Sequence, residues 1–196
     1  MTSKELFVAL RRVLADLTRD KRRVALVGGL AVSVRAEVRF TRDVDLVVVV
    51  VDDADAEALV AALSRVGYSA VAAVEQDAVK RLSTVRLLSP DRVKVGLLFA
   101  SSGIESEIVA RASDVDVPNV GAVPVAQAEE LLAMKVLSMT HRRLQDRIDA
   151  QRLITRNPKL DFARVRAHLD LIMERAFARD QKLHEKLDSV IAETNG

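Results

Sequence analysis

The sequence predicts an α/β (α+β) protein in which helices flank a mixed β-sheet and a helical bundle follows. Short valine- and leucine-rich runs alternate with segments of helical spacing over residues 1–125. Two extended runs, 79–88 and 93–99, flank a turn at Pro90 and Asp91, as in an antiparallel hairpin. From residue 126 onward the spacing is almost wholly helical. We therefore expect a sheet core over residues 1–125 and a helical subdomain over residues 126–196.

The elements of the first part follow from their apolar patterns. We expect helices at 3–20, 30–37, 56–65 and 104–111, strands at 24–27, 43–51, 68–74, 79–88 and 93–99, and short extended segments over 115–125. Asp52, Asp53 and Asp55 form the turn and cap before the third helix, because acids in a first helical turn complement the helix dipole. We expect one parallel crossover near the start of this sheet and antiparallel pairing later.

The second part contains four expected helices. Their ranges are 126–139, 142–155, 162–178 and from 181 to the end. Asn157 and Pro158 break the helical pattern, and Asp161 caps the helix that follows.

Composition narrows the class of protein. Apolar residues make up 49% of the 196, which is ample for a core, and aromatic residues only 3%. The absence of cysteine excludes disulfides and Cys-ligated zinc and fits a reducing cytoplasm. Formal net charge is only +2, so bulk charge does not indicate a nucleic-acid binder. We expect no signal peptide and no membrane span, since the longest apolar run, 46–51, is too short.

Asp43 and Asp45 are the first candidate site. They are two residues apart on a strand, so their side chains project from one face. Two adjacent carboxylates repel each other unless a cation lies between them. We interpret the pair as ligands of a divalent metal, Mg²⁺, which prefers oxygen and shares its ligands with phosphates. The alternative is a polar strand entrance with both acids in water.

Gly28 and Gly29 are the second candidate site. They follow an apolar strand and precede a helix, where glycine lets the backbone approach a ligand closely and the helix N-terminus favours anions. This predicts a phosphate site beside the metal site.

These residues together resemble a known family. The glycine pair followed by R-x-x-x-R-x-T-x-D-x-D-L resembles the nucleotidyltransferase (polymerase-β-like) fold, in particular the AbiEii/MenT-type bacterial nucleotidyltransferase toxins. The matching residues are Gly28, Gly29, Arg35, Arg39, Thr41, Asp43, Asp45 and Leu46. The resemblance continues through residues 97–105 and 135–149. It implies binding of an NTP with Mg²⁺, transfer of NMP to an acceptor such as a tRNA 3′ end or another RNA, and a cognate antitoxin protein.

Gly96 departs from that family. The resemblance implies a third carboxylate on a neighbouring strand, in a V-D-L-L-F pattern, whereas this chain has Val95-Gly96-Leu97-Leu98-Phe99. Three explanations stay open: a nucleotide-binding protein that transfers poorly, an inactive variant, or a substitute acid such as Asp77 or Asp91.

Lys135, Arg143, Asp146 and Asp149 form a third constellation, similar to the K…R-x-x-x-D-x-x-D segment of the family. The resemblance implies that Lys135 meets the triphosphate and that Asp146 orients that lysine or the substrate. The alternative is a set of ion pairs on a helix surface, with Asp146 reaching back to Arg142. We expect Arg39 to contact phosphate and Thr41 to hold the loop or donate a hydrogen bond; the alternative for both is a polar loop. Ser101, Ser102 and Gly103 are either an anion site or a plain helix start.

Three functions therefore compete. The leading one is nucleotidyl transfer in a toxin–antitoxin or phage-defence system. The second is a catalytically inactive regulator that keeps the fold and binds a partner protein, which Gly96 favours. The third is transfer to a small molecule, although no acidic pocket for a cationic drug is evident in the sequence.

Overall fold

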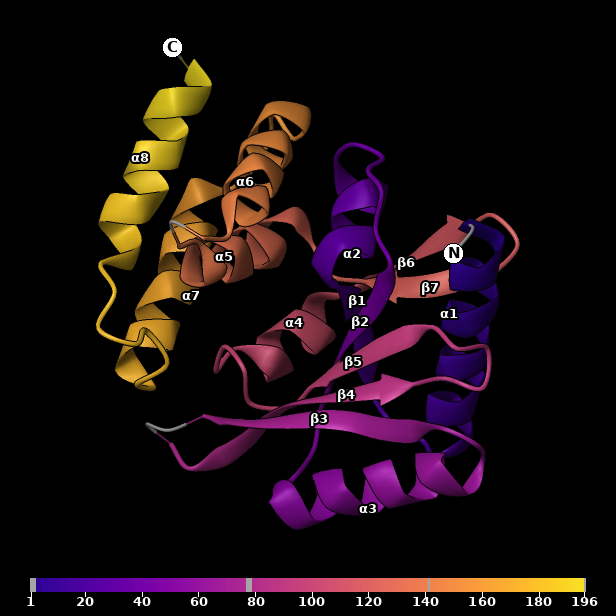
Figure 1. The fold of residues 1–196 in the computed structure, drawn as a ribbon. Coiled ribbons are helices and arrows are strands. Elements are labelled where there is room, and N and C mark those ends of the chain that lie inside the picture. The colour runs from indigo at the N-terminus through magenta and orange to yellow at the C-terminus, as the bar shows by residue number, and fades with distance from the viewer. Residues whose placement is uncertain (1–2, 77–78, 141, 196) are drawn as a thin grey trace.

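The computed structural model describes residues 3–76, 79–140 and 142–195. The chain order is α1 (Ser3–Arg19), β1 (Val24–Val27), α2 (Gly28–Arg35), β2 (Asp43–Val48), α3 (Asp53–Arg65), β3 (Ser69–Gln76), β4 (Arg81–Leu88), β5 (Lys94–Leu98), α4 (Glu105–Arg111), β6 (Ser113–Val117), β7 (Gly121–Val125), α5 (Ala128–Ser138), α6 (Leu144–Arg156), α7 (Phe162–Glu174) and α8 (Leu183–Asn195). The predicted fold class, a mixed sheet with flanking helices and C-terminal helices, is confirmed (Figure 1).

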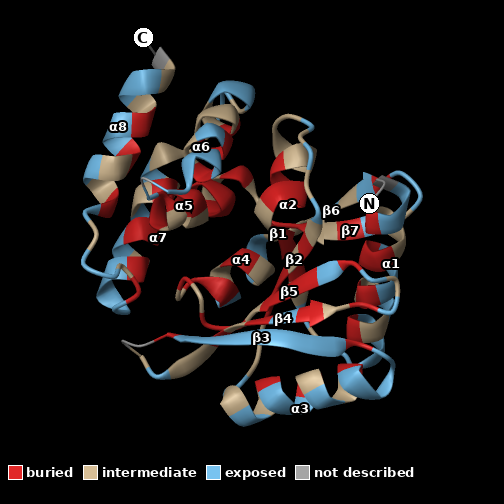
Figure 2. Ribbon diagram, viewed as in Figure 1, coloured by how far each residue is buried: buried red, intermediate tan, exposed pale blue. Residues whose placement is uncertain are grey.

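The sheet has seven strands in the order β3-β4-β5-β2-β1-β7-β6 among the described residues. Its central strands are buried, whereas β3 at one edge is exposed along almost its whole length (Figure 2). Each central strand is hydrogen-bonded to a neighbour on both sides, as β2 is to β1 and β5. The backbone that carries the side chains of β2 therefore has little freedom to move. A site built on β2 is therefore rigid.

The expected parallel crossover near the start of the sheet is wrong. β1 and β2 are antiparallel although a helix joins them, and the parallel pairs are β2 with β5 and β1 with β7. The reason is the short α2, about 12 Å long at 1.5 Å per residue. It leaves the end of β1 and packs against α5 and α6 instead of running back along the sheet, and the loop 36–42 returns to the same end.

Most predicted boundaries agree within a few residues, with three differences. Helix α2 begins at Gly28, so the glycine pair forms its first turn and is not a loop before it. Strand β2 ends at Val48, and α7 ends at Glu174. Asp52 caps α3 by accepting a hydrogen bond from the Asp55 backbone N–H at 2.8 Å, as expected.

The four C-terminal helices gather on one side of the molecule, with α2 between them and β1 (Figure 1). Their apolar residues and those of the sheet belong to one continuous core, which includes Leu46, Leu97, Leu131 and Leu153. In the part of the chain that the structure describes, no helix has the length and apolar character to cross a membrane.

Candidate active site

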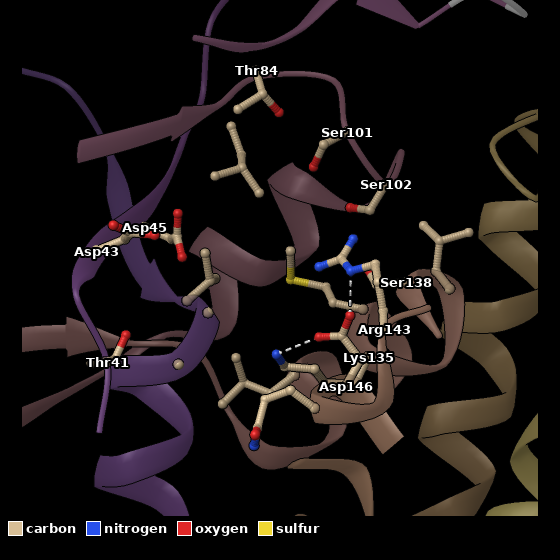
Figure 3. A pocket seen from close by; sticks show the side chains of 18 of the residues that line it. Thr41, Asp43, Asp45, Thr84, Ser101, Ser102, Lys135, Ser138, Arg143 and Asp146 are labelled. Carbon is tan, nitrogen blue, oxygen red and sulfur yellow. Dashed lines mark hydrogen bonds and ion pairs between the residues drawn. The ribbon is translucent and has the colours of Figure 1, made fainter. Parts of the chain in front are cut away.

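A cavity of about 890 Å³ opens between the sheet and the helices α5 and α6. Every residue that the sequence singled out for metal, nucleotide or catalysis lines it: Gly28, Gly29, Arg39, Thr41, Asp43, Asp45, Lys135 and Asp146. Figure 3 shows the two acids of β2 on one side of this space and Lys135, Arg143 and Asp146 on the other. The fold thus brings together segments that are far apart in the sequence.

Asp43 and Asp45 share one face of β2, and their neighbours Val44 and Leu46 point into the core. Burial raises the pKa of the Asp45 carboxyl. Among the neighbouring charges, Arg86 lowers this pKa most strongly, whereas the negative charge of Asp43 raises it further. The pair therefore forms a negative centre that a cation would stabilise.

The glycine pair makes room for two side chains of the site. Gly28 has a positive φ of 66°, and a Cβ there would lie 2.3 Å from Oδ2 of Asp45. A Cβ on Gly29 would lie 2.3 Å from Nη2 of Arg39. The sequence predicts that these glycines let the backbone approach a ligand, whereas in the structure Asp45 and Arg39 occupy the space that the glycines leave.

Gly96 lies beside Asp45, on the adjacent strand. The parallel register of β2 and β5 pairs Asp45 with Gly96, and the antiparallel register of β5 and β4 pairs Gly96 with Arg86. Of the substitute acids, Asp91 is bound by Arg12, with Nε 2.6 Å from Oδ2, and does not line the cavity. Asp77 lies outside the described residues.

Lys135 is held by two carboxylates of α6. Its Nζ donates to Oδ1 of Asp146 at 2.8 Å and lies 2.7 Å from Oδ2 of Asp149. Nε of Arg143 lies 2.7 Å from the other oxygen of Asp146 (Figure 3). Lys135 and both acids are buried, so the surface interpretation of this segment is wrong, although the Arg143–Asp146 pair is of the helical i,i+3 type.

Asp149 joins the helices to the loop before β2. Nη2 of Arg39 donates to Oδ2 of Asp149 at 2.9 Å, and Nε of Arg39 lies 2.8 Å from Oδ1. Burial acts to raise the pKa of Asp149, but the hydrogen bond and charge of Lys135, with Gln145 and Arg39, hold it below its ordinary value. In this structure Arg39 therefore binds a carboxylate at the place where sequence reasoning expected phosphate.

Arg35, the first arginine of the motif, does not line the cavity. Its Nε donates to the carbonyl oxygen of Ala126 at 2.9 Å and its Nη2 to that of Val125 at 2.8 Å. It fastens α2 to the end of β7, which is a structural role.

The loop from Ser101 to Gly103 is a helix start. The backbone N–H groups of Ser101, Ser102 and Gly103 all donate to the buried carboxylate of Glu105, at 2.8, 2.7 and 2.9 Å. Because the chain's own anion fills these donors, the alternative of an external anion site loses its support.

The sequence alone indicates neither a role for Arg86 at the site nor the burial of Asp149. No spacing in the sequence relates Arg86 to Asp45, because the two meet only through the strand order β4-β5-β2. Asp149 was visible in the motif, but its burial was not.

Asp43 and Asp45 suit a divalent cation only in part. Two carboxylates on one face offer oxygen ligands of the type that Mg²⁺ prefers. Among the described residues, no group of three or more His, Cys, Asp or Glu side chains could hold a metal. The donor set therefore fits a cation whose remaining ligands come from phosphate and water, as is usual for Mg²⁺.

Three solved structures have a fold similar to that of this chain. The solution structure of the antibiotic-resistance factor ANT(2'')-Ia aligns with a TM-score of 0.57 at 15% identity, covering 94% of this chain and 100% of that one. An antigenic nucleotidyltransferase-like protein from Paracoccidioides brasiliensis aligns with a TM-score of 0.55 at 18% identity, covering 96% and 94%. ANT(2'')-Ia in complex with adenylyl-2''-tobramycin gives 0.54 at 14%, covering 89% and 99%. These likenesses establish the fold.

A comparison with curated protein sequences found no match. The profile of the family described as nucleotidyl transferase AbiEii toxin, type IV toxin–antitoxin system, matches residues 10–193. That range contains every sheet strand and all the residues around the cavity. The resemblance that the glycine pair and the two acids of β2 indicated extends over nearly the whole chain, and this protein belongs to the AbiEii nucleotidyltransferase toxin family.

Proposed function

We propose that this protein binds a nucleoside triphosphate with Mg²⁺ and transfers NMP to an acceptor, RNA such as a tRNA 3′ end. In the cell it acts in the cytoplasm as the toxin of a toxin–antitoxin or phage-defence system, with a cognate antitoxin protein. The observation that carries the chemical part is the convergence of Asp43, Asp45 and the Lys135–Asp146 pair on one cavity.

The residues divide the work by position. Asp43 and Asp45 hold Mg²⁺, which supplies positive charge to the triphosphate when bound. Lys135 meets the phosphates as a point charge, and Asp146 orients it. Arg39 anchors the loop before β2 to α6, and Thr41 lies in that loop. Arg39 and Thr41 line the cavity together with the glycine pair and contribute to nucleotide binding there.

The transfer step is a displacement at the α-phosphorus. An acceptor hydroxyl oxygen forms a bond to that phosphorus, and the bond to the bridging oxygen of the β-phosphate breaks. Pyrophosphate leaves with the electron pair, and the hydroxyl proton passes to solvent. Positive charge along the cavity stabilises the charge that develops on the phosphate.

The charge of the cavity supports a polyanionic acceptor. Its described lining includes seven cationic side chains and three acidic ones: Arg39, Arg42, Arg86, Lys135, Arg142, Arg143 and Arg179 against Asp43, Asp45 and Asp146. A cationic drug would meet repulsion at such a surface, whereas a phosphate backbone would be attracted. This favours RNA over transfer to a small cationic molecule.

A second candidate is an inactive regulator that keeps the nucleotide and acts by binding a partner protein. Gly96 favours it, because the position beside Asp45 carries no carboxylate. Growth arrest on expression that depends on Asp43 separates the two functions.

Isothermal titration of the protein with each NTP and Mg²⁺ tests the binding. The Asp43→Asn plus Asp45→Asn variant is expected to lose the heat of binding, because β2 then has no carboxylate that would hold the cation. The matched control is Asp114→Asn plus Asp116→Asn, which alters a second D-x-D, exposed on β6 and outside the cavity. Equal heats from the β2 variant and the control would refute the proposal.

A further inference from the structure

Three neighbouring strands place Asp45, Gly96 and Arg86 in one row. Asp45 on β2 pairs with Gly96 on β5, and Gly96 pairs with Arg86 on β4. Residues paired across neighbouring strands project from the same face of the sheet. Gly96 has no side chain, so nothing from that position stands between the aspartate and the arginine.

The carboxylate of Asp45 uses the space above Gly96. A Cβ on Gly96 would lie only 2.5 Å from Oδ1 of Asp45. The oxygen therefore occupies the volume into which a carboxylate at position 96 would have to project. A third acid and the present position of Asp45 exclude each other.

Arg86 is the strongest positive influence on Asp45. Its charge acts on that carboxylate more than the charge of Lys135 or of Arg39 does. Arg86 is exposed and lines the cavity, and its side chain makes no hydrogen bond or ion pair with any residue in the described part of the chain. Lys135, Arg39 and Arg143, in contrast, are already bound by Asp146 and Asp149.

We propose that Arg86 is a catalytic residue that replaces a second divalent cation. In two-metal phosphoryl-transfer sites, two cations stabilise the attacking and the leaving oxygen. Here Asp43 and Asp45 hold one cation, and the guanidinium of Arg86 supplies the other positive charge across Gly96. Its planar fork donates to the α-phosphate oxygens as the acceptor attacks. This inference rests on the proposed nucleotidyl transfer and deepens it.

Such a site needs only one metal ion, which explains why position 96 carries no third carboxylate. A guanidinium remains charged at any physiological pH and needs no carboxylate to hold it. Gly96 is then required, because a side chain there would separate Arg86 from Asp45.

Counting Mn²⁺ by electron paramagnetic resonance tests this without an acceptor. The full-length protein with an α,β-methylene NTP analogue is expected to bind one Mn²⁺. The Gly96→Asp plus Arg86→Gln variant, in which Asp45 can rotate away from the new carboxylate, is expected to bind two. Arg86→Gln alone is expected to bind Mn²⁺ without nucleotide about tenfold more tightly, because it removes a repelling charge from the cavity.

Transfer of label from [α-³²P]NTP to total RNA is the second readout. Arg86→Gln is expected to lower it about 100-fold, the effect of removing one donor to a developing oxyanion. Arg86→Lys keeps part of the rate. The control Arg81→Gln removes the same charge from the other end of β4, outside the cavity, and is expected to change neither Mn²⁺ affinity nor transfer.

The outcomes separate this inference from the proposed function. Two Mn²⁺ ions in the unaltered complex, or unchanged Mn²⁺ affinity in Arg86→Gln, would overturn the role of Arg86 while nucleotide binding stands. Failure of the unaltered protein to bind any analogue with Mn²⁺ would overturn the proposed function, and this inference with it.

Discussion

At the scale of single residues, Asp149 is the group that connects the two sides of the site. It is fully buried and bound by Lys135 from α5 and Arg39 from the loop before β2. A buried carboxylate between two cations adds little net stability when intact, but removing it leaves Lys135 with one carboxylate partner, Asp146, instead of two and takes the carboxylate away from the part-buried Arg39. Asp149 therefore helps Asp146 to position Lys135, and its removal is expected to lower the free energy of unfolding.

Asp149→Asn is expected to lower the free energy of unfolding by about 3 kcal/mol, since it breaks a buried ion pair from one side. Urea denaturation at pH 7 measures this. The control Asp188→Asn removes one partner of an exposed pair with Arg166 and is expected to cost less than about 1 kcal/mol. An equal loss of unfolding free energy in the two variants would show that Asp149 stabilises the fold no more than an exposed ion pair does.

The stability difference between the unaltered protein and Asp149→Asn is expected to depend on pH. The pKa of Asp149 is lower in the folded than in the unfolded state, so its stabilisation is complete above the unfolded value of about 4 and is lost as the pH falls through the folded value. The difference in unfolding free energy between the unaltered protein and Asp149→Asn should therefore shrink below about pH 4. A difference that stays constant to pH 3 would contradict this assignment.

At the scale of elements, the junction of β1, α2 and β2 determines the direction of Asp45. Val27, the last residue of β1, pairs with Asp45, and Gly28 follows it directly in the left-handed region of φ. Any side chain at position 28 is strained and also meets the Asp45 carboxylate. The first turn of α2 thus limits where that carboxylate can lie.

Gly28→Ala is expected to reduce both stability and NTP binding. Alanine in the left-handed region costs about 1–2 kcal/mol, and its methyl group displaces Asp45. Gly121→Ala is the matched control, because Gly121 also has a positive φ, of 99°, but nothing lies within 4 Å of its added Cβ. Thermal unfolding should show a loss in both variants and titration calorimetry a loss of binding in Gly28→Ala alone; equal binding in both would exclude contact with Asp45 as the cause.

At the scale of the whole molecule, the cavity lies between the sheet and the C-terminal helices, so a bound nucleotide would contact both. The division into a nucleotidyltransferase core, 1–125, and a helical subdomain, 126–196, stays a prediction. The ion pair of Arg39 with Asp149 links the two parts, and Arg175, which follows α7, lies 2.7 Å from Glu107 on α4.

NTP with Mg²⁺ is expected to protect both sides of the cavity from hydrogen exchange. Protection should rise in β2, in α5 and at the start of α6, because a nucleotide in the cavity that Asp43, Asp45 and Lys135 line would contact all three segments. At a ligand concentration of 100 times Kd the unfolding free energy should rise by about 2.7 kcal/mol. Mass spectrometry of exchanged peptides measures this, with β6 as an internal control outside the cavity. Protection confined to one side would contradict a bridging ligand.

Much of the site could be predicted from local spacing. The D-x-D of β2 and the glycine pair belong to one continuous stretch, and alternation along a strand is enough to align the two acids. Gly96 was recognisable as a departure from a pattern. Arg86 was not, because its relation to Asp45 depends on which strands are neighbours.

The sequence by itself determined the fold class, the family and eight of the residues that line the cavity, because these depend on apolar periodicity and on motifs within short segments. Only the tertiary structure decided that β1 and β2 run antiparallel, that Lys135 and Arg39 share Asp149, and that Arg86 faces Asp45 across Gly96. These facts depend on strand order and on the packing of α2 against α5 and α6. Strand order and helix packing join residues over long sequence distances, where side-chain periodicity carries no information.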